Sequence, residues 1–521
     1  MRRSNADGRR YVEARRVLVA AVVVAGLGAM AACDARALPP FGQLRIQVET
    51  DAPIPAIVSR LRVDVFRDGH WIESRDASLR DRADWPASFT VLSSETTASP
   101  HIRVRLRAYR EGAVRDYRGE RFVPPPPPGT PMSAEPSEPD RSDEPRLVLD
   151  GEDRTPLDEP TPEAAIDRLV GATLREGEVR DVHILLRIEC AGTMADLSGD
   201  RTCVSTRGEL VTTPDASAGA DTASSKWIQA LDDARRVLPP PRVARLAPDG
   251  TPLHDDEVVV PGGVLLLGSR ENGAVSTIYG KRIPATPERV FVVPPMLLDR
   301  FEYTVGRYRD ALRRGFTTAL PPLVNEQPGF DETNAQRLCT FSTAALAGAE
   351  SREEMPLTCL EWKTARQLCM FDGGDLPTEA AWEHAATNAD RSSKTSFPWG
   401  DQSPSCDEAV WGRLSDPLLG RPCSPGGVLP VTAGTRDISP SGVFGLGGSM
   451  TEFTRDTYRP YRSTCWASAP LWDPVCIDDA HHEIALRGGT WAQTPLSTCA
   501  MRATTSRELY GYDGGFRCAR R

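Results

Sequence analysis

The sequence predicts an α+β protein in which a small β-sandwich-like domain precedes a larger, loop-rich domain clamped by disulfides. Alternating apolar and polar residues mark short strands in the N-terminal half, with the period of two that half-buried strands show. The C-terminal half has two short helical patterns, followed by long stretches rich in Gly, Pro and Trp. Nine of the 12 cysteines lie between Cys339 and Cys518, where disulfides could hold a domain with so little regular structure. A length of 521 residues favours two or three domains.

The first 33 residues have the features of a bacterial export signal. Six arginines precede an apolar run of 16 residues, 17–32, which ends in small residues before Cys33. The stretch Met30-Ala-Ala-Cys33 resembles a lipobox, in which the cysteine is acylated and becomes the mature N-terminus. We therefore expect a lipoprotein signal peptide at 1–33 and a chain that is membrane-anchored in the cell envelope, facing the periplasm or the surface. Cleavage as a plain secretory signal and retention as an uncleaved anchor are alternatives, and all three export the rest of the chain.

The β-rich domain is expected at residues 42–211. A second strand-like pattern after a long polar stretch suggests that the chain returns to the first sheet. The intervening segment, 124–162, opens with five prolines and is dense in Pro, Asp, Glu and Ser, so we expect a disordered loop inside one domain. A polar linker at 212–250 leads to the C-terminal domain, 251–521. The predicted strands cover residues 44–48, 61–66, 89–92, 102–106 and 182–188.

Export determines how the cysteines are interpreted, because thiols outside the cytoplasm are largely oxidised. Cys190 and Cys203 lie close together and far from the others, so they form the natural first pair. The number of cysteines from Cys339 onward is odd, so at least one is free or bonded outside this region. Spacing alone leaves the connectivity open, although proximity suggests three more pairs. They are Cys339–Cys359, Cys406–Cys423 and Cys465–Cys476.

Six motifs follow one another in a fixed order from about Val260 to the C-terminus. They are PGGVLLLG (261–268), DRFEYTV (299–305), W-x-x-A…C…LPTEAAWE (362–383), FPWGD (397–401), RGGTW (487–491) with Arg502, and GFRC (515–518). Each motif alone is weak, whereas the ordered series is specific, and it resembles the formylglycine-generating enzyme, or sulfatase-modifying factor, family. The resemblance implies a variant of the C-type lectin fold and a disulfide between Cys369 and Cys518.

The same resemblance implies chemistry that these residues do not fully supply. Family enzymes oxidise a sulfatase cysteine to formylglycine with copper held by two cysteine thiolates that follow the R-G-G-S-W-like motif. A soft ion such as Cu(I) favours thiolates. This chain has Gln493 at the first position, and Cys499 lies about one residue out of register with the second. We therefore expect no copper and a non-catalytic binding or structural module, with a divergent formylglycine-generating oxidase as the alternative.

Cys499 is the candidate catalytic residue of that alternative. Three interpretations remain open for it: a buried free thiol, a member of a reshuffled disulfide, or a reactive remnant of the active site. Glu379 and Glu383, at i and i+4 on the second predicted helix, are expected to serve packing and solvation rather than acid–base chemistry.

A structural calcium site is a second expectation from the family. The G-N-V-W-E-W segment of family members supplies calcium ligands, and here it reads Gly447-Gly-Ser-Met-Thr-Glu-Phe453. Ser449 replaces the asparagine, while Glu452 and Asp456 retain carboxylate oxygens, the kind of ligand that calcium prefers. Ser449, Glu452 and Asp456 are therefore the candidate metal residues.

Composition limits the partners without naming one. The net charge of −10 argues against nucleic acid, because phosphate binding needs a basic face. The sequence has no phosphate-binding glycine loop, no G-x-S-x-G and no C-x-x-C motif. Besides the membrane, reached through the N-terminal lipid, the expected ligand is a protein, a peptide or a glycan.

Overall fold

The computed structural model describes residues 42–521 with gaps, so the predicted signal at 1–33 and its Cys33 lie outside the described residues. Among the described helices, none is both long and apolar enough to cross a membrane. The gaps are 93–99, 111–120, 124–145, 150–151, 154–161, 198, 205–207, 216–225, 270–284, 328, 330, 347, 349–350, 416–419, 494–495 and 497.

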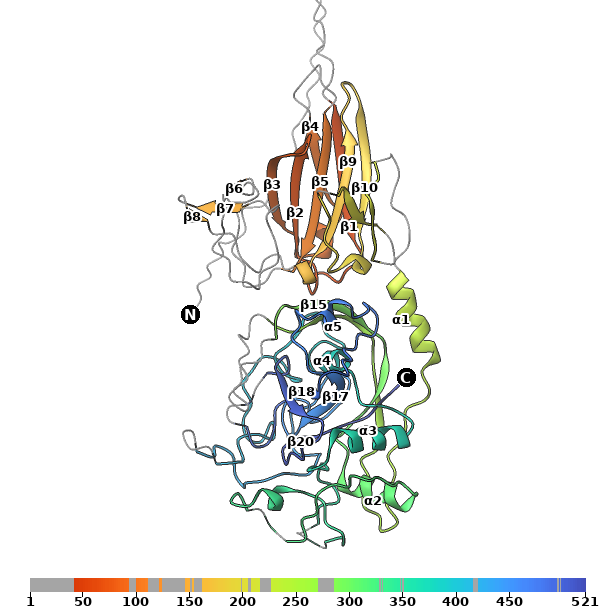
Figure 1. The fold of residues 1–521 in the computed structure, drawn as a ribbon, viewed down its shortest axis with the longest axis vertical. Coiled ribbons are helices and arrows are strands. Elements are labelled where there is room, and N and C mark those ends of the chain that lie inside the picture. The colour runs from red at the N-terminus through yellow and green to blue at the C-terminus, as the bar shows by residue number, and fades with distance from the viewer. Residues whose placement is uncertain are drawn as a thin grey trace, which may run out of the picture. The chain divides into compact units, whose positions relative to one another are not determined.

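The N-terminal domain is a sandwich of two sheets (Figure 1). One sheet has the order β10-β1-β4, in which β1 (Gln43–Thr50) pairs in parallel with β10 (Val179–Leu186) and antiparallel with β4 (Ala87–Leu92). The other has the order β3-β2-β5-β9, and apolar side chains from both sheets form one core. Its strands are β2 (Arg60–Arg67), β3 (His70–Ser78), β5 (His101–Tyr109) and β9 (Ile166–Thr173).

Several features of this part differ from the sequence-based expectation. β3 and β9 had no recognised pattern. Most of the segment 124–162, expected to be a disordered loop, lies outside the described residues, and within it the structure describes two short strands that form a small sheet with a third. The small strands are β6 (Arg121–Val123), β7 (Arg146–Leu149) and β8 (Glu152–Asp153), and a hairpin of β11 (Arg201–Cys203) and β12 (Leu210–Thr212) follows later.

The expected linker, 212–250, is also partly structured. It contains helix α1 (Lys226–Val237), none of whose residues is buried. Near its end, the guanidinium of Arg242 pairs with Glu257 at 2.8 Å and with Asp299 at 3.1 Å. The last residues of this segment are thus already held by ion pairs to the C-terminal domain.

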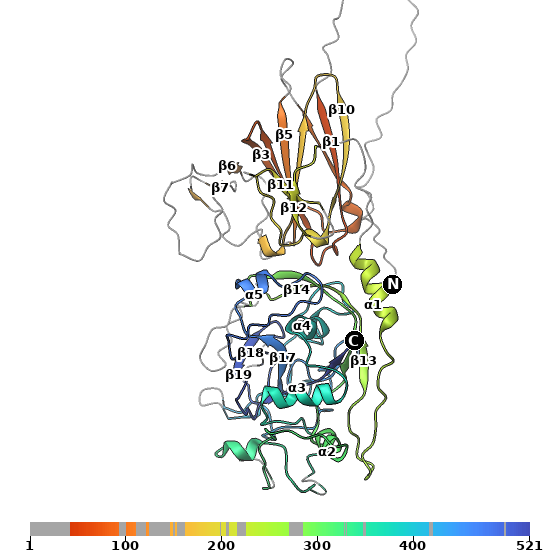
Figure 2. The same ribbon diagram turned by 45° about the vertical axis from the view of Figure 1, so that its right-hand side comes forward.

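The C-terminal domain is loop-rich and is built around helix α4 (Glu379–Thr387) (Figure 2). All nine residues of α4 are buried, and the helix contacts strands β14, β15, β17 and β18. Thr378 caps it by accepting a hydrogen bond from the amide of Ala381. Three sheets surround the helix, with the orders β13-β16-β21, β14-β15 and β19-β18-β17-β20. The elements are β13 (Glu257–Val260), β14 (Gly263–Leu267), β15 (Arg289–Val293), β16 (Met296–Asp299), α2 (Val305–Arg313), α3 (Trp362–Phe371), β17 (Thr451–Thr457), α5 (Thr464–Ala467), β18 (Glu483–Arg487), β19 (Arg502–Ser506), β20 (Gly514–Gly515) and β21 (Ala519–Arg520).

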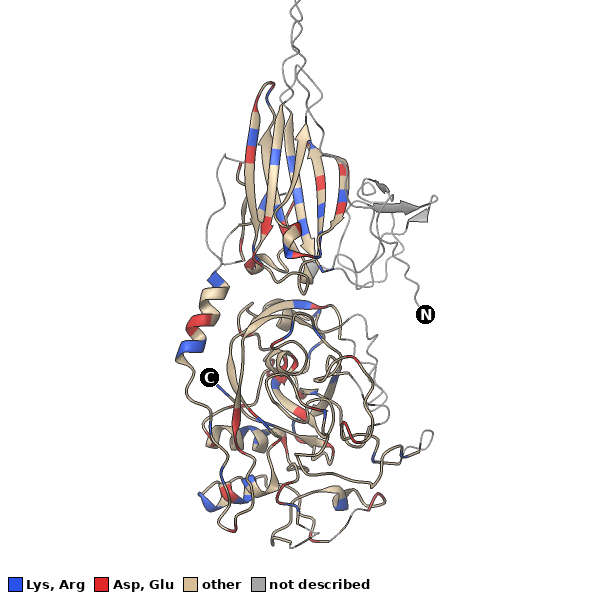
Figure 3. Cartoon of the chain, turned by 180° about the vertical axis from the view of Figure 1, so that it is seen from behind, with Lys and Arg blue, Asp and Glu red and all other residues tan. Residues whose placement is uncertain are grey.

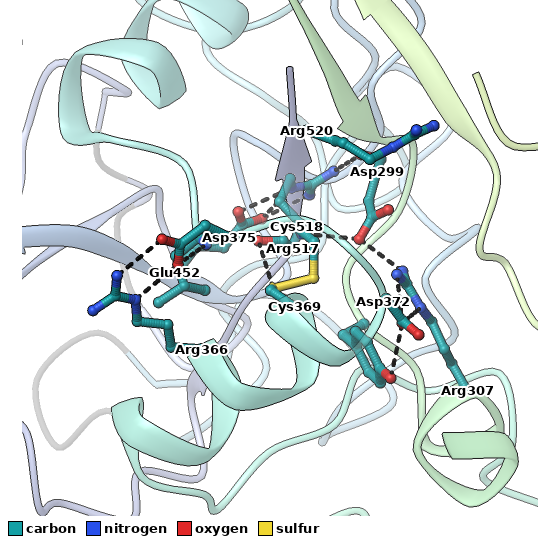
Figure 4. The surroundings of a disulfide bond; sticks show 12 residues. Asp299, Arg307, Arg366, Cys369, Asp372, Asp375, Glu452, Arg517, Cys518 and Arg520 are labelled. Atoms are coloured by element: carbon teal, nitrogen blue, oxygen red, sulfur yellow. Dashed lines mark hydrogen bonds and ion pairs between the residues drawn. A yellow bond between two sulfur atoms is a disulfide. The ribbon is translucent and has the colours of Figure 1, made fainter. Parts of the chain in front are cut away.

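Disulfides hold the loops. The bond between Cys369 on α3 and Cys518 joins residues 149 apart, and the amide of Cys518 donates to Asp299 at 2.8 Å (Figure 4). Asp299 also pairs with Arg307 at 2.7 Å, so covalent and ionic contacts meet at one place. The structure forms four further disulfides, Cys190–Cys203, Cys339–Cys359, Cys406–Cys423 and Cys465–Cys476.

Candidate functional site

The candidate site lies where β18 ends and the chain turns through Gly488, whose φ is +86°. That backbone conformation is open to glycine and costly for other residues, which explains the first glycine of the Arg-Gly-Gly pattern. At the second, Gly489, a Cβ would lie 2.6 Å from the carbonyl oxygen of Gly447. Arg487, at the end of β18, is fully buried. One of its nitrogens donates to the carbonyls of Cys499 at 3.2 Å and Ala500 at 3.1 Å. The guanidinium therefore fixes the segment that carries Cys499.

Cys499 is a buried free thiol, so the first of its three open interpretations describes the structure. Its side chain has no exposed surface and packs in the core cluster that contains Trp382 and Trp466. The thiol donates a weak hydrogen bond to the carbonyl of Leu446 at 3.5 Å. Burial, reinforced by nearby carboxylates such as Asp437, raises the pKa of Cys499 well above its ordinary value. In the metal-free protein the thiol is therefore protonated at neutral pH, the form that does not attack a substrate.

A second thiolate for copper is not available among the described residues. All other described cysteines are in disulfides. Gln493 lies at the position of the first family cysteine. Its backbone N–H donates to the carbonyl of Thr490, and its backbone carbonyl accepts a hydrogen bond from the N–H of Gly412. The residues present therefore do not fit a two-thiolate copper site.

The candidate calcium residues use their oxygens within the protein. Glu452 binds the guanidinium of Arg517 with both oxygens and also accepts from the indole of Trp382 at 2.8 Å. Asp456 accepts from two backbone amides, those of Glu379 at 2.7 Å and Cys476 at 2.8 Å. Across the described residues, no group of three or more His, Cys, Asp or Glu side chains is placed to hold a metal ion.

Ser449 lies next to a buried carboxyl group, that of Glu302, which the sequence did not predict as part of a site. Its backbone has φ +65°, and its hydroxyl lies beside Glu302. Both oxygens of Glu302 are buried without a hydrogen bond of good geometry among the described residues, and the nearest guanidinium nitrogen, on Arg517, is 3.8 Å away. Burial raises the pKa of Glu302 to about 8. The only signal in the sequence was the Glu within DRFEYTV.

A further buried acid, Asp437, had no signal in the sequence. It accepts from the amides of Gly447 and Gly448, and burial raises its pKa to about 6. Glu302 and Asp437 could each carry a proton near neutral pH. Both side chains are fully buried, however, and acid–base catalysis requires contact with a substrate.

Glu379 and Glu383 pack in the interior, as expected, but they are not solvated. Both are fully buried and ion-paired. Arg502 donates to Glu379 at 2.9 Å, and Arg487 pairs with Glu383 at 2.6 Å. Lys394 also contacts Glu383. The expectation of solvation was wrong because two arginines from distant strands replace water around this helix.

Comparison with known proteins agrees with this geometry. Residues 243–521 match the model of the sulfatase-modifying factor enzyme 1-like domain. A protein from Bacillus subtilis, called uncharacterized protein YfmG, is 24% identical over 284 residues, which are 51% of this chain and 54% of that protein. The chain thus spans about half the length of this relative. A mouse protein named inactive C-alpha-formylglycine-generating enzyme 2 is 26% identical over 292 residues, which are 50% of this chain and 84% of that protein.

Two solved structures are similar at lower identity. PvdO from Pseudomonas aeruginosa is 18% identical, with a TM-score of 0.39, and the match covers 54% of this chain and 99% of that one. Treponema denticola variable protein 1 is 13% identical, with a TM-score of 0.36 and the same coverages. Because the family model matches more than half of the chain, the protein belongs to the sulfatase-modifying factor, or formylglycine-generating enzyme, family through its C-terminal domain.

Proposed function

We propose that the C-terminal domain is a non-catalytic module that binds a partner or has a structural role. The observation that carries this proposal is the position of Cys499, which is fully buried and has no second free cysteine beside it in the described part of the chain. Copper(I) in a two-sulfur site needs two thiolates, so the described residues supply one sulfur ligand where two are required. The similarity to a mouse protein named as inactive supports the same conclusion.

The decisive experiment is an anaerobic Cu(I) titration of the full chain, with thiols counted before and after denaturation. We expect no tight copper site and a thiol at Cys499 that reacts only after unfolding, because its side chain has no exposed surface. Cys499→Ser should remove that thiol and leave copper binding unchanged. Stoichiometric, tight copper binding that disappears in Cys499→Ser would contradict the proposal and favour the divergent oxidase.

A gain-of-ligand variant provides a matched control. Gln493→Cys places a second sulfur at the family's first copper position without altering Cys499. Because the Cys499 side chain is fully buried in the packed core around Trp382 and Trp466, we expect this variant also to lack tight copper binding. If Gln493→Cys alone created a tight copper site, the thiol of Cys499 would be available to metal, contrary to our argument.

We further propose that the chain is exported and anchored in the bacterial envelope by a lipid at Cys33. The disulfides support export, since such bonds persist in oxidising compartments. Acidic and basic residues are interspersed over the described strands and helices (Figure 3), which favours a protein, peptide or glycan partner over nucleic acid. Mass spectrometry of the mature N-terminus tests the anchor. Acylated Cys33, with release from membranes in Cys33→Ser, is the expected result, and an unmodified N-terminus at another residue would contradict it.

A further inference from the structure

Strand β4 forms an edge of the sandwich that carries no protective charge. Among the described strands it pairs only with β1, so every second residue directs its backbone N–H and C=O groups away from the sheet. Its sequence, Ala-Ser-Phe-Thr-Val-Leu, contains no charged residue and no proline. Edges of this kind are templates for pairing with another strand.

The other sheet edges of the sandwich differ in this respect. Charged side chains interrupt β10 and β3, as is usual for edges that must stay unpaired, and isolated bridges to Ala191 and Asp215 cover part of β9. The contrast makes β4 the one edge of the two described sandwich sheets with neither charge nor proline. The charged residues are Arg180 and Asp181 on β10, and Glu73, Arg75 and Asp76 on β3, whereas Asp167 and Arg168 on β9 are buried.

The inward side chains of β4 are also incompletely covered. Phe89 and Val91 are only half-buried against the sandwich core, whereas Leu44 and Ile46, their neighbours on β1, are 0% and 1% exposed. The apolar core between the two sheets is therefore left partly exposed along β4. A further strand beside β4 would cover these side chains and satisfy the outward backbone groups at the same time.

We propose that the occupant of this edge is β4 of a second copy of the chain, which pairs antiparallel across a twofold axis into a continuous six-stranded sheet. A twofold interface brings the same surface together twice, so it must be self-complementary. Strand β4 meets this condition because it is neutral and its pattern alternates in both directions. With the axis at Thr90, Phe89 lies opposite Val91 of the second copy on the inner face, and Ser88 lies opposite Leu92 on the outer face.

Sedimentation of the full chain in mild detergent tests the proposal. The wild type should sediment with the mass of two chains. Ser88→Lys with Thr90→Lys should sediment as one chain, since both positions are exposed on the outer face and the added charges would oppose each other across the axis. The matched control is Val179→Lys with His183→Lys on the opposite edge strand, β10, where both side chains are also exposed; it should remain a dimer. A monomeric wild type, or a dimer that survives the lysines on β4, would overturn the proposal.

Cysteine cross-linking gives a second readout that does not require the dimer to survive dilution. Thr90→Cys should form a disulfide-linked dimer under mild oxidation, because the two copies of this residue meet at the axis. His183→Cys likewise adds one exposed cysteine on an edge strand and should stay monomeric on a non-reducing gel. Equal cross-linking of the two variants, or none in Thr90→Cys, would contradict the arrangement. Far-ultraviolet circular dichroism identifies any variant that has failed to fold.

Discussion

Removal of the Cys369–Cys518 disulfide should destabilise the C-terminal domain more than removal of a short-loop disulfide. The bond closes a loop of 149 residues, whereas Cys339–Cys359 closes one of 20. Loop-closure entropy in the unfolded chain then gives a contribution of about 5 kcal/mol for the long loop and about 3 kcal/mol for the short one. All four side chains are at most 3% exposed, so the packing lost on replacement by alanine is similar in the two pairs. The difference of roughly 2 kcal/mol therefore isolates the effect of loop length.

The assay is denaturant unfolding of the double alanine variants, followed by tryptophan fluorescence. Trp382, Trp466 and Trp491 are fully buried in the C-terminal domain, so their emission reports on the unfolding of that domain. The free energy of unfolding should fall further in Cys369→Ala/Cys518→Ala than in Cys339→Ala/Cys359→Ala. Equal losses, or a larger loss in the short-loop variant, would refute the entropic argument and point to strain or residual structure in the unfolded chain.

Two other predictions concern buried groups. Burial lowers the pKa of His384 to about 4, whereas the pKa in the unfolded chain is about 6.5. The unfolded chain therefore binds this proton more tightly, so the free energy of unfolding is highest above about pH 6.5 and falls by about 3 kcal/mol as the pH drops towards 4. His384→Gln should remove this pH dependence, measured as the free energy of unfolding at several pH values, and an unchanged profile would contradict the prediction. Gly445→Ala should lower the melting temperature more than Gly373→Ala. Both glycines have positive φ, but a Cβ at Gly445 would lie 2.7 Å from Glu302, whereas a Cβ at Gly373 would meet no atom within 4 Å. Equal shifts in melting temperature would show that the Glu302 side chain moves freely aside.

The alternating pattern predicted those strands of the sandwich that have one apolar and one polar face. β9 was missed because both of its faces are covered. Asp167, on the side away from the apolar core, is 1% exposed and pairs with Arg107, so a charged residue occupies a buried position and the alternation disappears. β3 was missed for the opposite reason, since an edge strand rich in Glu, Arg and Asp resembles a polar loop.

The sequence could single out candidate residues but not their contacts. The motifs drew attention to Cys499, Glu452 and Asp456 along the chain. They did not show that Arg517, 65 residues beyond Glu452, would take the oxygens assigned to calcium. An ion pair between distant residues leaves no local trace in one sequence, because spacing carries information only along a single helix or strand.

Family membership and catalysis depend on different residues in this domain. The motifs that identify the family include Arg487, Arg502 and Arg517, which are fully buried and neutralise the carboxylates around helix α4. Loss of one such partner would leave an uncompensated buried charge, at a cost of roughly 3–5 kcal/mol, so the stability of the fold depends on these residues. Gln493, by contrast, lies in a turn held by backbone hydrogen bonds to Gly412 and Thr490. Such bonds do not require a cysteine side chain at this position. The copper thiolates can therefore be lost while the family signature persists, which is why the motifs alone do not establish an oxidase.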